Sequence, residues 1–180
     1  MRAGAADAAA LEWEANDFAS ELLMPTRLFG ADAARRDFSV ATARELASDT
    51  YFDVSVTAAA WRMTQLSTEP CAIVMSSNRK VNWACRSESL RIPGLRRGSS
   101  IDSGTVACAA FSGGAGETQP LEVELDAWLE PRYPVRARLL ESTHVIGRTG
   151  QVLSMLWLAD AKQGDSARSR RSERLAGARS

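Results

Sequence analysis

Histidine is the scarcest chemically useful residue in this chain, because His144 is the only one among 180 residues. A catalytic zinc site of the common peptidase type needs two histidines one helical turn apart, a glutamate base between them, and a third ligand. No His-Glu-x-x-His stretch occurs in the sequence. His144 lies between Thr143 and Val145 in an apparent strand, which favours a packed residue over a metal ligand. These residues alone are therefore not expected to form a working zinc-peptidase site, and no catalytic residue is assigned.

Cysteines and long apolar runs are also scarce. The three cysteines, Cys71, Cys85 and Cys108, show no C-x-x-C spacing, which argues against a zinc knuckle or a disulfide framework. We expect free, buried thiols in a cytoplasmic protein. No apolar run approaches the roughly 20 residues that span a bilayer, and the N-terminus lacks a signal-peptide pattern. A membrane partner is therefore not expected.

The net charge is zero, since 22 basic residues balance 22 acidic ones. The charges are nevertheless unevenly distributed along the chain. The segment 162–180 holds six basic residues against two acidic ones and has almost no apolar side chains. Such a composition predicts a disordered basic tail. The tail could touch nucleic acid without sequence preference, although a solvated tail is the simpler interpretation.

The stretch LEWEANDFASELLMP, residues 11–25, predicts a helix that ends before Pro25. Its apolar residues recur at helical spacing and predict a core face of Leu11, Ala15, Phe18 and Leu22. A second stripe, which we expect to face protein, contains Glu12, Asn16, Ala19 and Leu23. A solvated face contains Glu14, Asp17 and Glu21. Because unpaired buried polar groups are costly, Glu12 and Asn16 need partners. Local backbone or an arginine would be the simplest ones.

The string E-x-E-A-N-x-F-A-x-E-L-L-M-P in this helix resembles a segment of the ImmA/IrrE family of zinc metallo-endopeptidases. In that family the helix follows the His-Glu-x-x-His helix and supplies a glutamate as third zinc ligand. The resemblance implies that Glu12 is this ligand, with Glu14 as the alternative in another register. It also implies that Asn16, one turn on, orients a zinc-bound histidine.

The resemblance carries expectations about the whole protein. It implies a zinc cofactor, a gluzincin-like peptidase fold, and cleavage of a transcriptional repressor in a bacterial stress response. Since His-Glu-x-x-His is absent, we expect a family member shortened at its N-terminus, inactive by itself and binding no zinc. We also expect an exposed apolar surface near Leu11, Ala15, Ala19 and Leu23, where the absent helix would pack. The alternative is a non-catalytic remnant that binds a ligand or partner.

The middle of the chain predicts two helices that resemble a helix-turn-helix. Ser39 is the expected N-cap of the first helix, and Ser55 or Asp53 that of the second. The inner face of the second helix should contain Val56, Ala59, Ala60, Met63 and Leu66. The residues left for DNA bases are few, namely Thr57, Arg62, Thr64 and Gln65. Sequence-specific binding of nucleic acid is therefore not expected, and DNA binding by this pair and the basic tail ranks third.

The remaining sequence predicts an antiparallel sheet. Cys71–Met75 and Val81–Cys85 form a hairpin pattern, for which we expect a loop of four or five residues because the turn has no glycine. Leu121–Leu129 alternates like a half-exposed strand, and two further strands follow it. The order of these predicted strands and the sequence pattern ES-x-x-x-I-G-R-x-G-x-V-L-x-x-L-W resemble the GAF-like C-terminal domain of IrrE-like proteins. Its tryptophans could line a ligand pocket: Trp83, Trp128 and Trp157.

The predicted fold class is therefore α+β, with four segments. Residues 1–36 would be the C-terminal part of the peptidase domain, and residues 37–68 the helix-turn-helix-like segment. Residues 69–161 would be the GAF-like sheet domain, and residues 162–180 the tail. The sequence does not indicate an oligomeric state.

Overall fold

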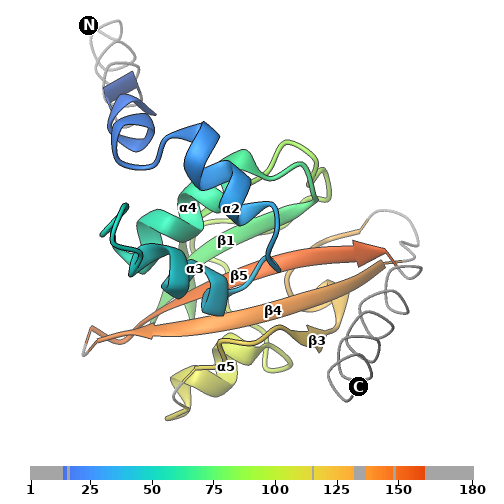
Figure 1. Ribbon diagram of the computed structural model, residues 1–180. Helices are drawn as coiled ribbons and strands as arrows, with labels where there is room; N and C mark the ends of the chain where they lie inside the picture. The colour runs from blue at the N-terminus through green and yellow to red at the C-terminus, as the bar shows by residue number, and fades with distance from the viewer. Residues whose placement is uncertain (1–13, 16, 115, 132–136, 148, 161–180) are drawn as a thin grey trace, which may run out of the picture.

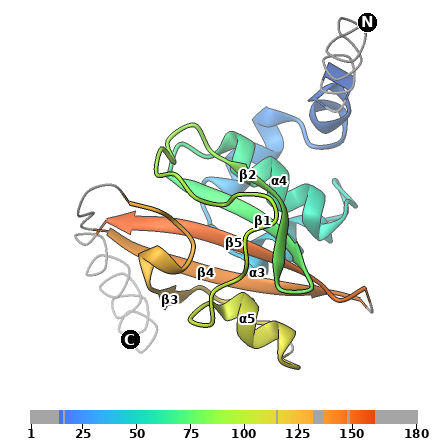
Figure 2. The ribbon, with the colours of Figure 1, turned by 180° about the vertical axis from the view of Figure 1, so that it is seen from behind.

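A five-stranded antiparallel sheet lies between a layer of helices on one face and loops with one short helix on the other (Figures 1 and 2). The computed structural model describes residues 14–160, apart from residues 16, 115, 132–136 and 148. The strand order is β2-β1-β5-β4-β3. The α+β class predicted from the sequence is confirmed.

The helical layer begins with helical residues at 14–15 and 17–23, and Pro25 follows their end as predicted. Ser39 and Ser55 cap α3 and α4 by accepting hydrogen bonds from the backbone N–H groups of Thr42 and Ala58. Both caps were predicted from the sequence. The remaining elements of this layer are η1 (Thr26–Gly30), α2 (Ala31–Ala33), α3 (Val40–Ala47) and α4 (Val56–Leu66).

The sheet is built on two long strands, β4 and β5, which pair along their full length. Strand β1 joins the other side of β5, and β2 forms the edge beyond it. The described strands are β1 (Cys71–Ser77), β2 (Lys80–Arg86), β3 (Leu121–Val123), β4 (Ala137–Ile146) and β5 (Gln151–Asp160).

The turn between β1 and β2 corrects one prediction. The strands end at Ser77 and begin again at Lys80, so the connection has two residues rather than four or five. Asn78 and Arg79 have φ angles of 50° and 57°, the left-handed conformation that tight hairpin turns require. The Arg79 guanidinium donates hydrogen bonds to Cys108 Sγ and Ser112 Oγ, which helps to hold this strained residue in place.

The alternating stretch Leu121–Leu129 is not one strand, which corrects a second prediction. Only β3 pairs with β4, and the chain then turns into the 3₁₀-helix η2 (Leu125–Ala127). The reason lies with Trp128, which is buried and donates its indole N–H to Glu141. This contact draws the chain off the sheet edge and across its face.

Each face of the sheet carries its own hydrophobic core. The helical side packs Phe29, Leu46 and Met63 against Ile73 and Met155 of the sheet. Residues on the opposite face pack against α5 (Val106–Phe111) and the surrounding loops, and include Val74, Leu129, Leu139, Val152 and Leu156. Because side chains alternate along a strand, neighbouring residues of β5 serve different cores.

Among the described residues, no helix is both long and apolar enough to cross a membrane. The predicted tail, residues 162–180, lies outside the described residues.

Candidate functional site

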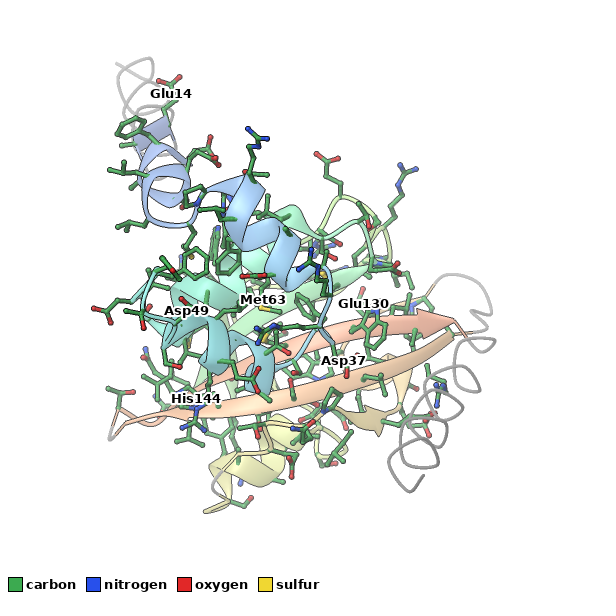
Figure 3. The ribbon with its side chains drawn as sticks, in the orientation of Figure 1. Glu14, Asp37, Asp49, Met63, Glu130 and His144 are labelled. Atoms are coloured by element: carbon green, nitrogen blue, oxygen red, sulfur yellow. The ribbon has the colours of Figure 1, made fainter. Side chains whose placement is uncertain are left out.

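The helix over residues 14–23 carries the sequence motif, and we call it the motif helix. It projects from the body of the molecule (Figures 1 and 3). The predicted zinc ligand Glu12 and its neighbour Asn16 lie outside the described residues. The alternative ligand, Glu14, is exposed near the outer end of this helix (Figure 3). The described residues therefore place Glu14 on the solvated face that was predicted for it.

The predicted core face of this helix is not buried, which corrects a third prediction. Phe18 and Leu22, which were expected in the core, are 70% and 69% exposed. Ala15 is exposed too, as the apolar surface expected near it requires. Periodicity identifies residues that share a face, but it cannot say whether anything covers that face. Within the described residues nothing covers this one, so it forms an apolar surface rather than a core.

The second stripe borders a pocket of about 440 Å³ between this helix, α4 and β2. Ala19 and Leu23, which the sequence analysis placed on one stripe with Glu12 and Asn16, both line it. We call this site the tryptophan pocket, because Trp61 and Trp83 form part of its wall. The full described lining is Asp17, Ala19, Ser20, Leu23, Met24, Ser55, Thr57, Ala58, Trp61, Gln65 and Trp83.

Two tryptophans from different elements meet at the tryptophan pocket. Trp61 of α4 and Trp83 of β2 have ring centroids 5.3 Å apart and ring planes inclined by 57°. Trp61 remains 38% exposed although its neighbours Ala60 and Arg62 are buried. The pair thus presents aromatic surface to the solvent side of the pocket.

Arg62 anchors the motif helix to α4. Its side chain is buried, at 5% exposure, and it forms an ion pair with Glu21. It also donates hydrogen bonds to the Met24 carbonyl oxygen at 3.1 Å and to Thr26 Oγ1 at 3.0 Å. Hydrogen bonds from Thr26 hold the pKa of the Glu21 carboxyl below its usual value, and Arg62 adds to this effect. One guanidinium therefore fixes the end of the motif helix.

The burial of Arg62 also affects whether α4 could recognise DNA. Two of the four residues expected to face bases, Arg62 and Thr64, are buried, and Thr64 donates its hydroxyl to the Ala60 carbonyl. Only Thr57 and Gln65 remain accessible, and both line the tryptophan pocket. The outward surface of α4 is thus poorer in groups for reading bases than its sequence indicated.

His144 stands apart from the motif helix. It lies on β4 far from Glu14 (Figure 3), so the two cannot bind one metal ion. Burial, followed by the positive charge of Arg44, lowers the pKa of His144 below 6.5, which keeps the imidazole neutral at pH 7. Within the described ranges, no group of three or more histidine, cysteine, aspartate or glutamate residues could hold a metal ion.

The three predicted free thiols are confirmed. Cys71 and Cys108 are buried and Cys85 is half-buried. Burial raises the pKa of the Cys71 and Cys85 thiols, so both stay protonated and are poor nucleophiles or metal ligands.

The tryptophans do not share one pocket, which corrects a fourth prediction. Trp83 lines the tryptophan pocket, whereas Trp157 lines a separate pocket of about 290 Å³ beside α2 and the end of α4. Trp128 lies in the core of the opposite face. The sheet separates Trp128 from the other two, because side chains on its two faces point in opposite directions.

A buried carboxylate on that opposite face was missed by the sequence analysis. Glu141 of β4 is fully buried and accepts four hydrogen bonds. Burial raises the pKa of its carboxyl, against the opposing effect of these donors. A glutamate directly after Leu139 and Leu140, in the middle of the predicted strand, was the available signal. The donors are Val106 N, Ala107 N, Trp128 Nε1 and Ser154 Oγ.

Residues 2–64 match a protein-family model described as the IrrE N-terminal-like domain, Peptidase_M78. The matched segment contains the motif helix, η1, α2, α3 and most of α4, and it ends before the sheet begins. No curated protein matches the chain.

Proposed function

We propose that residues 2–64, which match the IrrE N-terminal-like family model, Peptidase_M78, supply part of a zinc-dependent endopeptidase site. In this proposal the motif helix provides Glu12 as the third zinc ligand. Asn16, one turn further, orients a zinc-bound histidine. Glu14 is the weaker candidate, since its side chain is exposed on the other side of the helix.

The single observation that carries the proposal is the coincidence of the family match with the glutamate-helix motif. The uncovered face of that helix supports it. In this proposal the helix that carries His-Glu-x-x-His would pack against the exposed Phe18 and Leu22 and bury them. The Arg62 anchor would hold the motif helix in place for such packing.

The residues of this chain do not by themselves fit a catalytic zinc. Such a site takes three protein ligands, and here one candidate carboxylate stands on the motif helix while the sole histidine lies on β4. We therefore assign no hydrolytic step to the 180 residues. The proposal is a ligand-supplying segment that needs a His-Glu-x-x-His helix to become active.

Two finer elements complete the proposal. The substrate would be a transcriptional repressor, and the sheet would be a GAF-like domain that senses a small molecule controlling cleavage. The alternative is a non-catalytic module that binds a ligand or partner, which the 440 Å³ tryptophan pocket favours. DNA binding through α3, α4 and the basic tail ranks third, because α4 buries Arg62 and Thr64.

The proposal is tested by measuring the zinc content of the chain with and without an added His-Glu-x-x-His helix. The test protein joins a helix carrying His-Glu-x-x-His ahead of Met1, and its metal is counted by mass spectrometry beside the 180-residue chain. We expect about one zinc per molecule in the joined protein, because it offers three ligands. We expect almost none in the chain alone. Stoichiometric zinc in the chain alone, or none in a folded joined protein, would contradict the proposal.

A further inference from the structure

We propose that the tryptophan pocket binds an organic cation, specifically a small quaternary ammonium group. The inference goes beyond the zinc proposal and is tested separately from it, because it concerns Asp17, Trp61 and Trp83, to which that proposal assigns no role. It rests on three features of the pocket: its charge, its aromatic wall and its size.

The charge of the pocket is negative. Asp17 is the only charged side chain in its described lining, and it is exposed. Arg62 of α4 does not offset it, since Arg62 is buried and paired with Glu21. A cation entering the pocket would thus meet one carboxylate and no competing positive charge within that lining.

The aromatic wall adds a second attraction for a cation. The faces of tryptophan rings carry negative electrostatic potential, and a cation within about 6 Å of the ring centroid is attracted to it. The ring centroids of Trp61 and Trp83 lie 5.3 Å apart, so one ammonium group can lie within this distance of both. Their 57° inclination forms a corner rather than a flat stack.

Size and lining favour an alkylated ammonium over a metal ion or a bare amine. The volume of about 440 Å³ falls within the range of about 300–1,000 Å³ typical of small-molecule sites. Leu23, Met24 and Ala58 offer apolar surface for methyl groups, whereas one carboxylate is too few oxygen ligands for Ca²⁺ or Mg²⁺. The Ser55 and Thr57 side chains can meet a polar end of the ligand.

Choline and its neutral carbon isostere, 3,3-dimethylbutan-1-ol, test the proposal because they share shape and differ in charge. Each is titrated into the full 180-residue chain while the indole N–H signals of Trp61 and Trp83 are followed by NMR. We expect choline to bind with a Kd of about 1 mM and at least about tenfold more tightly than the isostere. Equal affinity, or shifts confined to Trp128 and Trp157, would overturn the proposal.

Matched variants identify the carboxylate. Asp17→Asn should weaken choline binding at least about fivefold, because it removes the charge with almost no change in shape. Asp37→Asn is the control, since Asp37 is an exposed aspartate that lines the separate Trp157 pocket. Its choline affinity should equal that of the unmodified chain. The same loss in both variants, or no loss in Asp17→Asn, would also overturn the proposal.

Discussion

Replacing Glu141 with leucine should lower the free energy of unfolding by about 4 kcal/mol or more. The carboxylate joins α5, β4, β5 and the loop after η2 through hydrogen bonds of 2.8–3.2 Å. Leucine has a similar volume but leaves four donors without an acceptor, three of them on buried residues, and each buried donor costs about 1–3 kcal/mol. Since small domains are stable by only about 5–15 kcal/mol, the variant should lie close to the unfolding threshold. Urea denaturation measures the loss.

The control for this prediction is Glu122→Leu on the adjacent strand. Glu122 is exposed and forms a surface ion pair with Arg138 at 3.3 Å, so its replacement should cost less than about 1 kcal/mol. Equal effects of the two substitutions would show that Glu141 does not hold the two layers together.

The contribution of Glu141 to the stability of the fold should decrease as the pH rises. Burial raises the pKa of the folded carboxyl above 4.5, so the folded protein binds the proton more tightly than the unfolded chain. The stabilisation is therefore complete below pH 4.5 and declines as the pH rises through the folded pKa. Because glutamine does not titrate, the stability difference between the unmodified chain and Glu141→Gln should shrink as the pH rises above 4.5.

Replacing Arg62 with methionine should cost about 2–3 kcal/mol and should loosen the motif helix first. Methionine keeps the apolar stem in α4 but removes the donors to Glu21, Met24 and Thr26. The Met24 carbonyl belongs to a buried residue, so its oxygen would be left without this donor. Hydrogen exchange should then accelerate over residues 17–24 before the sheet is affected.

Arg36→Met is the matched control for Arg62. Arg36 forms an ion pair with Glu45 at 2.6 Å, but its side chain is 40% exposed, and such pairs contribute about 0–1 kcal/mol. A conservative Arg62→Lys variant should recover only part of the loss, because an ammonium cannot reproduce the planar guanidinium fork. If Arg62→Met and Arg36→Met behave alike, the anchor does not exist.

Local signals in the sequence were sufficient for the starts of α3 and α4. Ser39 and Ser55 precede apolar residues at helical spacing, and a side-chain cap needs only the next three residues. The hairpin turn was mispredicted because Arg79 adopts a left-handed conformation with help from Cys108 and Ser112. Those two residues lie about 30 positions away, so no local pattern reveals them.

The candidate site shows the same division between local and distant information. Spacing alone placed Ala19 and Leu23 on one stripe, and both line the tryptophan pocket. Spacing could not show that the neighbouring face, with Phe18 and Leu22, is uncovered. Nor could it bring Trp83 of β2 against Trp61 of α4, because that contact depends on how the sheet packs against the helices.

The most direct test of the central claim is the zinc affinity of the joined protein, the one carrying a His-Glu-x-x-His helix, and of its Glu12→Gln variant. Competition with a coloured chelator measures both. If Glu12 is the third ligand, Glu12→Gln should bind zinc about 100-fold more weakly or worse, while Glu14→Gln keeps the original affinity. Unchanged affinity in Glu12→Gln would contradict the assignment, whether or not Glu14→Gln then loses zinc.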